Sequence, residues 1–164
     1  MIIKELRDED FVNYKKPSMF IAFPTCSWKC EKECGMQVCQ NSALAIAPNI
    51  SIDIPVLVER YCTNPITKAI VIGGLEPFDS PLTLPELIKE FREYTNDDII
   101  IYTGYRKDEL TDSFVSLREA YNKIKQFKNI IIKFGRFVPN QQPHYDEILG
   151  IKLMSDNQYA ERIS

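Results

Sequence analysis

Four cysteines stand close together near the start of the chain, which concentrates soft metal ligands in one short segment. Their positions are Cys26, Cys30, Cys34 and Cys39. Cysteine thiolates bind zinc and iron–sulfur clusters, and a cytosolic chain uses cysteines for metal binding or catalysis more often than for disulfides. This segment is therefore the first candidate for a metal centre.

A pair of glycines, Gly73 and Gly74, is the second candidate. The pair follows an apolar run that is typical of a strand, residues 68–72, and is itself followed by Glu76 and Pro77. Glycine at the end of a strand lets the backbone approach a ligand closely, because no Cβ stands in the way. We therefore expect an organic cofactor to lie beside the metal centre.

Short, continuous apolar runs alternate with helical patterns, and these are the elements that must position both candidates. Such runs are typical of a parallel sheet that is covered on both faces. The expected strands are residues 19–23, 68–72, 99–103 and 129–134. The expected helices are residues 53–61, 83–94 and 116–127, the second of them opened by a capping box of Thr83 and Glu86.

Ligands of such sheets bind at the carboxyl ends of the strands. Cys26 follows the first expected strand, the glycine pair follows the second, Thr103 and Gly104 end the third, and Arg136 lies just beyond the fourth. We therefore expect these residues to meet at one edge of the sheet. The simpler interpretation of Glu76 and Arg136 is that both are surface charges.

Length and charge exclude several classes of function. A chain of 164 residues fits one domain, residues 1–164, and its net charge of −3 argues against nucleic-acid binding. No apolar run is long enough to span a membrane, and the charged N-terminus lacks a signal core, so we expect a cytoplasmic protein. The single histidine, His144, is expected in a solvated loop and makes a Ser-His or Cys-His hydrolase improbable.

Together these motifs resemble the radical S-adenosylmethionine (SAM) family, in which three cysteines after the first strand bind an iron–sulfur cluster. The small activating enzymes of anaerobic ribonucleotide reductase carry an asparagine two places after the third cysteine, as Asn41 follows Cys39 here. The run 73–77 resembles the family's Gly-Gly-Glu-Pro motif, which binds the amino group of SAM's methionine. Residues 102–105 and 155–158 resemble further segments of those activating enzymes.

The resemblance implies an α/β fold: an incomplete barrel with a mainly parallel sheet flanked by helices. It implies an oxidoreductase of anaerobic metabolism with a 4Fe-4S cluster and SAM as cofactors, which cleaves SAM reductively to a 5′-deoxyadenosyl radical. The expected partners are a glycyl-radical enzyme such as anaerobic ribonucleotide reductase and a reductase or flavodoxin-type electron donor. The expected cofactor-binding residues are Gly73, Gly74, Glu76, Pro77, Thr103 and Gly104.

The cysteine spacing departs from the family, because eight residues separate Cys30 from Cys39 where the family has two, and Cys34 lies between them. The match at Asn41 favours Cys26, Cys30 and Cys39 as the iron ligands, with Cys34 in place of Cys39 as the alternative. A fourth thiolate would close the cluster to SAM.

Two other functions remain open. The four cysteines also fit a structural zinc site, which prefers pairs separated by two to four residues. The other alternative is a degenerate protein that binds a cluster but has no SAM chemistry. Two further residues have expected places: Trp28 packs over the cluster, and Cys62 is buried as a small hydrophobe.

Overall fold

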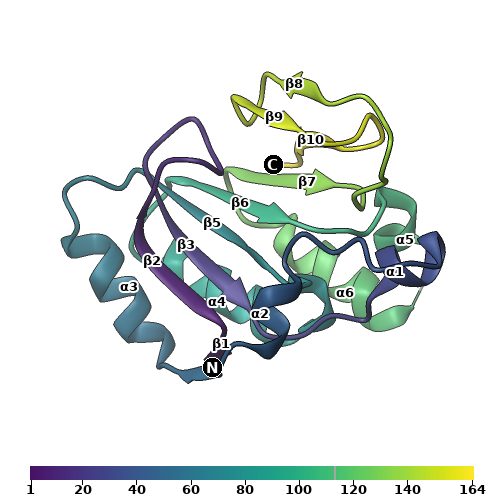
Figure 1. Cartoon of the computed structure of the whole chain (residues 1–164). Helices are drawn as coiled ribbons and strands as arrows, with labels where there is room; N and C mark the ends of the chain where they lie inside the picture. The colour runs from purple at the N-terminus through teal and green to yellow at the C-terminus, as the bar shows by residue number, and fades with distance from the viewer. Residues whose placement is uncertain (113) are drawn as a thin grey trace.

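A six-stranded sheet forms the centre of the protein, whose computed structural model describes residues 1–112 and 114–164 (Figure 1). The strands lie in the order β10-β7-β6-β5-β3-β2. The four inner strands are parallel to one another: β3 (Ser18–Phe23), β5 (Ala69–Gly74), β6 (Asp98–Tyr102) and β7 (Ile130–Phe134). All four were expected from the sequence, and the α/β class is confirmed.

The two outer strands run antiparallel to their neighbours. They are β2 (Glu5–Asp10), which pairs with β3, and β10 (Tyr159–Arg162), which pairs with β7. Within the described residues β2 and β10 do not pair with each other, so the sheet is open. Neither strand was expected, because both carry charged residues on a half-exposed edge rather than a continuous apolar run.

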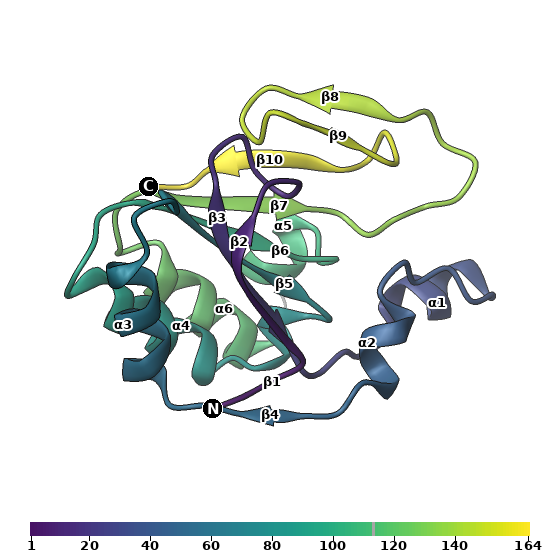
Figure 2. The same ribbon diagram turned by 60° about the vertical axis from the view of Figure 1, so that its left-hand side comes forward.

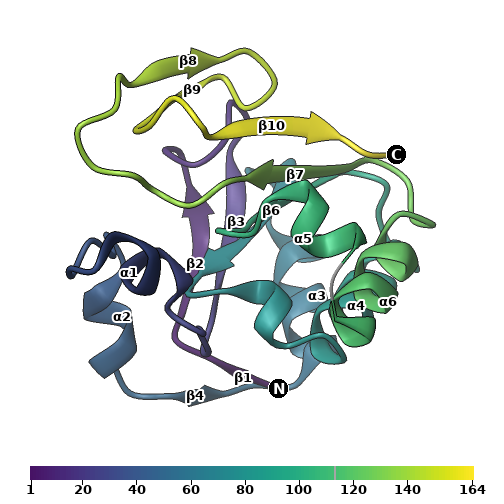
Figure 3. The ribbon, with the colours of Figure 1, turned by 90° about the vertical axis from the view of Figure 1, so that its right-hand side faces the viewer.

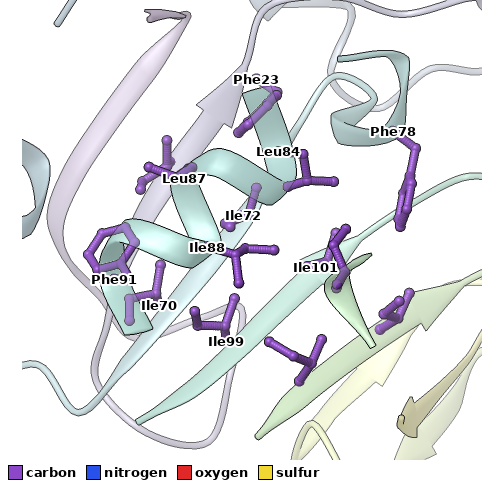
Figure 4. Packing of buried hydrophobic residues seen from close by; sticks show 14 of the residues in the cluster. Phe23, Ile70, Ile72, Phe78, Leu84, Leu87, Ile88, Phe91, Ile99 and Ile101 are labelled. Atoms are coloured by element: carbon purple, nitrogen blue, oxygen red, sulfur yellow. The ribbon is translucent and has the colours of Figure 1, made fainter. Parts of the chain in front are cut away.

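Three helices cover one face of the sheet: α3 (Ile54–Thr63), α4 (Thr83–Arg92) and α6 (Val115–Ile124). Each presents an apolar stripe to the strands, as helical spacing of apolar residues requires. Figure 4 shows this packing at α4, where Leu84, Leu87, Ile88 and Phe91 lie over the isoleucines of β5 and β6. The fully buried side chains of this layer form the main core.

The opposite face of the sheet is covered by strands and loops instead of long helices. A hairpin of β8 (His144–Asp146) and β9 (Ile151–Leu153) lies over it, and Figure 1 shows this hairpin beside β10. Leu149 and Leu153 from this segment pack with Tyr14 against Val71 and Ile100 of the strands. We call this side the inner face.

Short elements complete the chain. β1 (Ile2–Ile3) pairs with β4 (Ile50–Ser51), and a 3-10 helix, η1 (Pro77–Asp79), follows β5. α5 (Lys107–Thr111) precedes α6. α1 (Lys29–Cys34) and α2 (Ser42–Ile46) lie in residues 26–46, which we call the cysteine segment, and stand out from the sheet (Figure 2).

The expected capping box at the start of α4 does not form. Leu82, not Thr83, occupies the capping position, and no side chain caps this helix. A glutamate reaches back instead at α5, where the Glu109 carboxylate accepts a hydrogen bond from the backbone N–H of Arg106 at 2.8 Å. Sequence spacing alone placed the cap one residue too late, because the turn after η1 sets where α4 begins.

Two single-residue expectations were also wrong. Cys62 is exposed, because it follows Val58 and Tyr61 around α3 and so falls outside the stripe that faces the core. His144 lies in β8 and is partly buried, since the hairpin folds back over the inner face. Among the described residues, no helix has both the length and the apolar character that a membrane crossing requires.

Candidate metal and cofactor site

A cavity of about 680 Å³ opens where the four parallel strands end. It is lined by residues that follow each of these strands, so the expected meeting of strand ends occurs. Among the expected site residues, those that line it are Cys26, Cys30, Cys39, Gly73, Gly74, Glu76, Thr103, Gly104 and Arg136. Cys34, Pro77 and Trp28 are absent from the described lining.

The three lining cysteines all come from the cysteine segment. Burial raises the pKa of the Cys26 thiol to about 12, against a smaller opposing effect of the Trp28 N–H, which donates a hydrogen bond to its sulfur. Burial also raises the pKa of Cys30, and the charge of Cys39 adds to the increase. Without a metal the Cys26 and Cys30 thiols therefore stay protonated at neutral pH.

The donor chemistry suits a soft metal or an iron–sulfur cluster, since three thiols face one cavity. Their present arrangement is looser than a bound metal needs. In residues 1–112 and 114–164, no three histidine, cysteine, aspartate or glutamate side chains come close enough together to hold a metal ion. Metal binding would have to draw the thiols toward a common point.

Polar contacts fasten the start of the cysteine segment to the strand ends. The backbone N–H of Ser27, next to Cys26, donates to Asp79, and the Tyr105 hydroxyl donates to the other oxygen of Asp79 at 2.6 Å. Further along, the Asn41 side chain donates to the Gly74 carbonyl at 2.7 Å. The segment is thus tied at both ends to the turns after β5 and β6.

A side chain would meet different obstacles at Gly73 and at Gly74. Gly74 has φ +84°, and an added Cβ would lie 2.6 Å from the Ala22 Cβ of β3, so the strand contact itself excludes a side chain. An added Cβ at Gly73 would instead meet the Phe20 ring at 3.3 Å and the Tyr102 Cβ at 3.4 Å. Both of these side chains line the cavity, so only Gly73 keeps space free there.

Glu76 is buried, so its interpretation as a surface charge was wrong. Its carboxylate accepts hydrogen bonds from the Phe78 N–H, the Thr103 hydroxyl and the Gly104 N–H at 3.1, 2.7 and 2.8 Å. Burial raises the pKa of Glu76 to about 7, although all three donors act against that increase. The residue joins the ends of β5 and β6, and its oxygens are already used by protein donors.

Arg136 is likewise buried, contrary to the surface interpretation, and is 5% exposed. One nitrogen, Nη2, lies 2.8 Å from each oxygen of Glu109, and Nε lies 3.4 Å from Glu33 of α1. Lys29 of α1 donates to the same Glu109 carboxylate at 3.1 Å. Burial acts to raise the pKa of Glu109, but the hydrogen bonds from Arg136 and Lys29 help lower it to about 2. Charged residues of the cysteine segment therefore anchor α1 to the end of β7.

Among the cavity residues that sequence reasoning missed is Lys133 of β7. It is 6% exposed and lines the cavity from the inner face. Its position was visible as a lysine inside an otherwise apolar strand, Ile130–Phe134. A charge in such a run is costly to bury and is therefore a signal of function.

Comparisons of the chain with family models, with curated proteins and with solved structures return no match. The resemblance noted from the sequence therefore rests on its motifs. The geometry adds that the cysteine motif, the glycine pair and the segment 102–105 reach the same cavity, although they lie far apart in the sequence.

Proposed function

We propose that the protein is a radical SAM enzyme that holds a 4Fe-4S cluster through Cys26, Cys30 and Cys39 and cleaves SAM reductively. The observation that carries the proposal is the shared cavity: these three cysteines line it together with Gly73 and Gly74, whereas Cys34 does not. When bound, such a cluster supplies the electron that breaks a carbon–sulfur bond of SAM. The open, mainly parallel sheet is consistent with an incomplete barrel.

The chain's own residues would bind and orient the substrate. Because Gly73 has no side chain, space stays free in the cavity for the ligand. The carbonyl of Gly74, which accepts a hydrogen bond from Asn41, is an acceptor for an ammonium group. Glu76 fixes the spacing of two strand ends through Thr103 and Gly104. Their shared task is to keep the backbone around the ligand rigid before it binds.

The proposed partners follow from the same assignment. A glycyl-radical enzyme would present its glycine at the mouth of the cavity, and a reductase or flavodoxin-type protein would deliver the electron. Both would approach the edge where the cysteine segment lies, because the helices and the β8–β9 hairpin cover the two faces of the sheet (Figure 3).

Anaerobic reconstitution with iron and sulfide tests the cluster. We expect about four irons per chain in the wild type, because three clustered thiolates suit a four-iron cluster. Cys26→Ala, Cys30→Ala and Cys39→Ala should lose the iron, whereas Cys34→Ala, the matched control from the same segment, should keep it. Stoichiometric zinc without iron uptake would favour the structural zinc site instead. Retention by Cys39→Ala with loss by Cys34→Ala would reverse the ligand assignment.

A second measurement tests SAM chemistry on the reconstituted protein. SAM should change the electron paramagnetic resonance signal of the reduced protein, and dithionite should then produce 5′-deoxyadenosine. Gly73→Val should weaken the SAM response and leave the iron content intact, because its side chain would enter the cavity and not the cysteine segment. A fully loaded wild-type protein that ignores SAM would leave the degenerate cluster protein as the answer.

A further inference from the structure

α1 carries two of the four cysteines, and charged side chains attach it to the rest of the protein. The helix buries none of its residues, so apolar packing contributes little to its position. Lys29 donates to the Glu109 carboxylate at 3.1 Å, and Glu33 lies 3.4 Å from Arg136 and 4.0 Å from Arg106. The position of α1 therefore depends on ion pairs with α5 and with the turn after β7.

The two attachment points of α1 lie on one face of the helix, because Lys29 and Glu33 are four residues apart. The groups that receive them are fixed by each other: Nη2 of the buried Arg136 lies 2.8 Å from both oxygens of Glu109. A buried pair is screened less by salt than a pair on the surface. We call Lys29, Glu33, Glu109 and Arg136 the α1 network.

Each attachment point directly precedes a cysteine, Lys29 before Cys30 and Glu33 before Cys34. Fixing the rotation of the helix therefore also fixes the directions of both thiols. Cys30 lines the cavity and Cys34 does not. Because the two cysteines share a helix face, a shift of α1 by about one turn, roughly 5.4 Å, would bring Cys34 to the place of Cys30.

A second contact of Lys29 restricts such a shift. Its Nζ lies 4.5 Å from the centroid of the Tyr105 ring, and the Tyr105 hydroxyl donates to Asp79. Asp79 also accepts a hydrogen bond from the backbone N–H of Ser27, just before α1. The start of α1 is thus held on two sides by groups that are themselves linked.

We propose that the α1 network keeps Cys34 out of the cavity, so that the site presents three thiols instead of four. Its members act through the position of α1 and are positioning residues. The inference rests on the proposed function for its consequence, since a fourth thiolate would close a cluster to SAM. The position of Cys34 itself can be measured without a cluster.

Cobalt(II) titrated into the metal-free protein reports how many thiolates bind, because the sulfur-to-cobalt absorption band grows with their number. The test variant is Lys29→Met/Glu33→Gln, which removes both α1 charges of the network and leaves the sheet unchanged. The matched control is Glu31→Gln/Lys32→Met. It makes the same change in composition on the same helix, at positions that form no ion pair in the described part of the chain.

The wild type and the control should show equal bands, and Cys34→Ala should leave the wild-type band unchanged. The band of the test variant should rise by about one third, as four thiolates replace three around a tetrahedral metal. Adding Cys34→Ala to the test variant should restore the wild-type band, which a merely structural effect would not do. A band that falls when Cys34→Ala is introduced into the wild type would overturn the proposal. So would an unchanged band in the test variant, or a wild type that binds no cobalt.

Hydrogen exchange at the amides of α1 in the metal-free protein separates the attachment from the metal chemistry. We expect exchange to be about tenfold faster in the test variant than in the control, because a hydrogen bond between charged groups is lost. Equal exchange in the two variants would overturn the proposal whether or not any metal binds. Faster exchange with the expected cobalt bands upholds it, even if the wild type takes up no iron or ignores SAM. That last result would count against the proposed function alone.

Discussion

The buried carboxylate of Glu76 accepts hydrogen bonds from three donors that lie just after two strands. Glu76→Gln keeps the size but replaces one acceptor oxygen by an NH₂ group, so one buried donor is left without a partner. We expect the free energy of unfolding to fall by about 1–3 kcal/mol, as is typical for an unsatisfied buried donor. Urea unfolding measures this, with Glu86→Gln on the exposed side of α4 as the control. Equal stability of the two variants would contradict the role assigned to Glu76.

The glycine pair provides a second test, because adjacent positions should respond differently. Gly74→Ala places a Cβ at positive φ and within 2.6 Å of Ala22, so it should lower the free energy of unfolding by about 2 kcal/mol or more. Gly73→Ala meets only contacts of 3.3 Å and longer and should cost less than about 1 kcal/mol. Denaturant unfolding of both variants measures which one loses more free energy of unfolding. A larger loss for Gly73→Ala than for Gly74→Ala would refute the contacts described for the two glycines.

Part of the candidate site could be read from residue types alone. The cysteines and the glycine pair carry their chemistry in the sequence, so their place at the strand ends followed from the parallel-sheet rule. The roles of Glu76, Arg136 and Lys133 could not be read in this way. A charged side chain is assigned to the surface unless its partners are known, and the partners of Glu76 and Arg136 come from η1, the loop after β6, α5 and α1.

At the scale of elements, Asp98 at the start of β6 connects three segments. It accepts hydrogen bonds from Tyr14 at 3.0 Å, from Lys16 at 2.6 Å and from Arg162 of β10 at 2.8 Å. Burial acts to raise the pKa of Asp98, but these donors outweigh it and lower the value from 3.8 to about 2. The folded state therefore holds the proton more weakly than the unfolded state does.

A folded-state pKa below the unfolded value stabilises the protein at higher pH and loses this effect as the pH falls. Asp98→Asn should therefore lower the stability by about 1 kcal/mol at pH 7. The difference from wild type should shrink as the pH falls from about 4 to about 2. Urea midpoints across this range measure it, with Asp156→Asn, an exposed position, as the control. A difference that is independent of pH would exclude the charge as its cause.

Inner and outer elements differed in how well the sequence predicted them. The parallel strands are continuous apolar runs because both of their faces are buried, and this pattern is visible without a partner. β2 reads Glu-Leu-Arg-Asp-Glu-Asp and β10 reads Tyr-Ala-Glu-Arg, so their strand conformation depends on pairing with β3 and β7. Edge strands of this charged kind also resist pairing with other molecules.

At the scale of the whole molecule, the sheet and the candidate site are built differently. The sheet has apolar cores on both faces, whereas α1 and α2 contain no buried residue and are attached by polar contacts such as those of Lys29 and Asn41. We therefore expect the sheet to fold independently of the cysteine segment, unlike small zinc modules, which unfold without metal.

The contrast between the apolar sheet and the polar attachment of the cysteine segment has a consequence for cleavage of the chain. A protease has access to Lys32, which is exposed in α1, and a cut there would separate β1 to β3 from all later strands. The two fragments would remain one particle, because β3 pairs with β5 along five residues at the centre of the sheet. Brief trypsin treatment should thus give two bands on a denaturing gel but one unchanged peak in gel filtration. Two fragments that elute separately would mean that the cysteine segment, and not the sheet, holds the halves together. If the single peak persists, the covalent connection through the candidate site is dispensable for assembly, and the protein can be reconstituted from two separately made pieces.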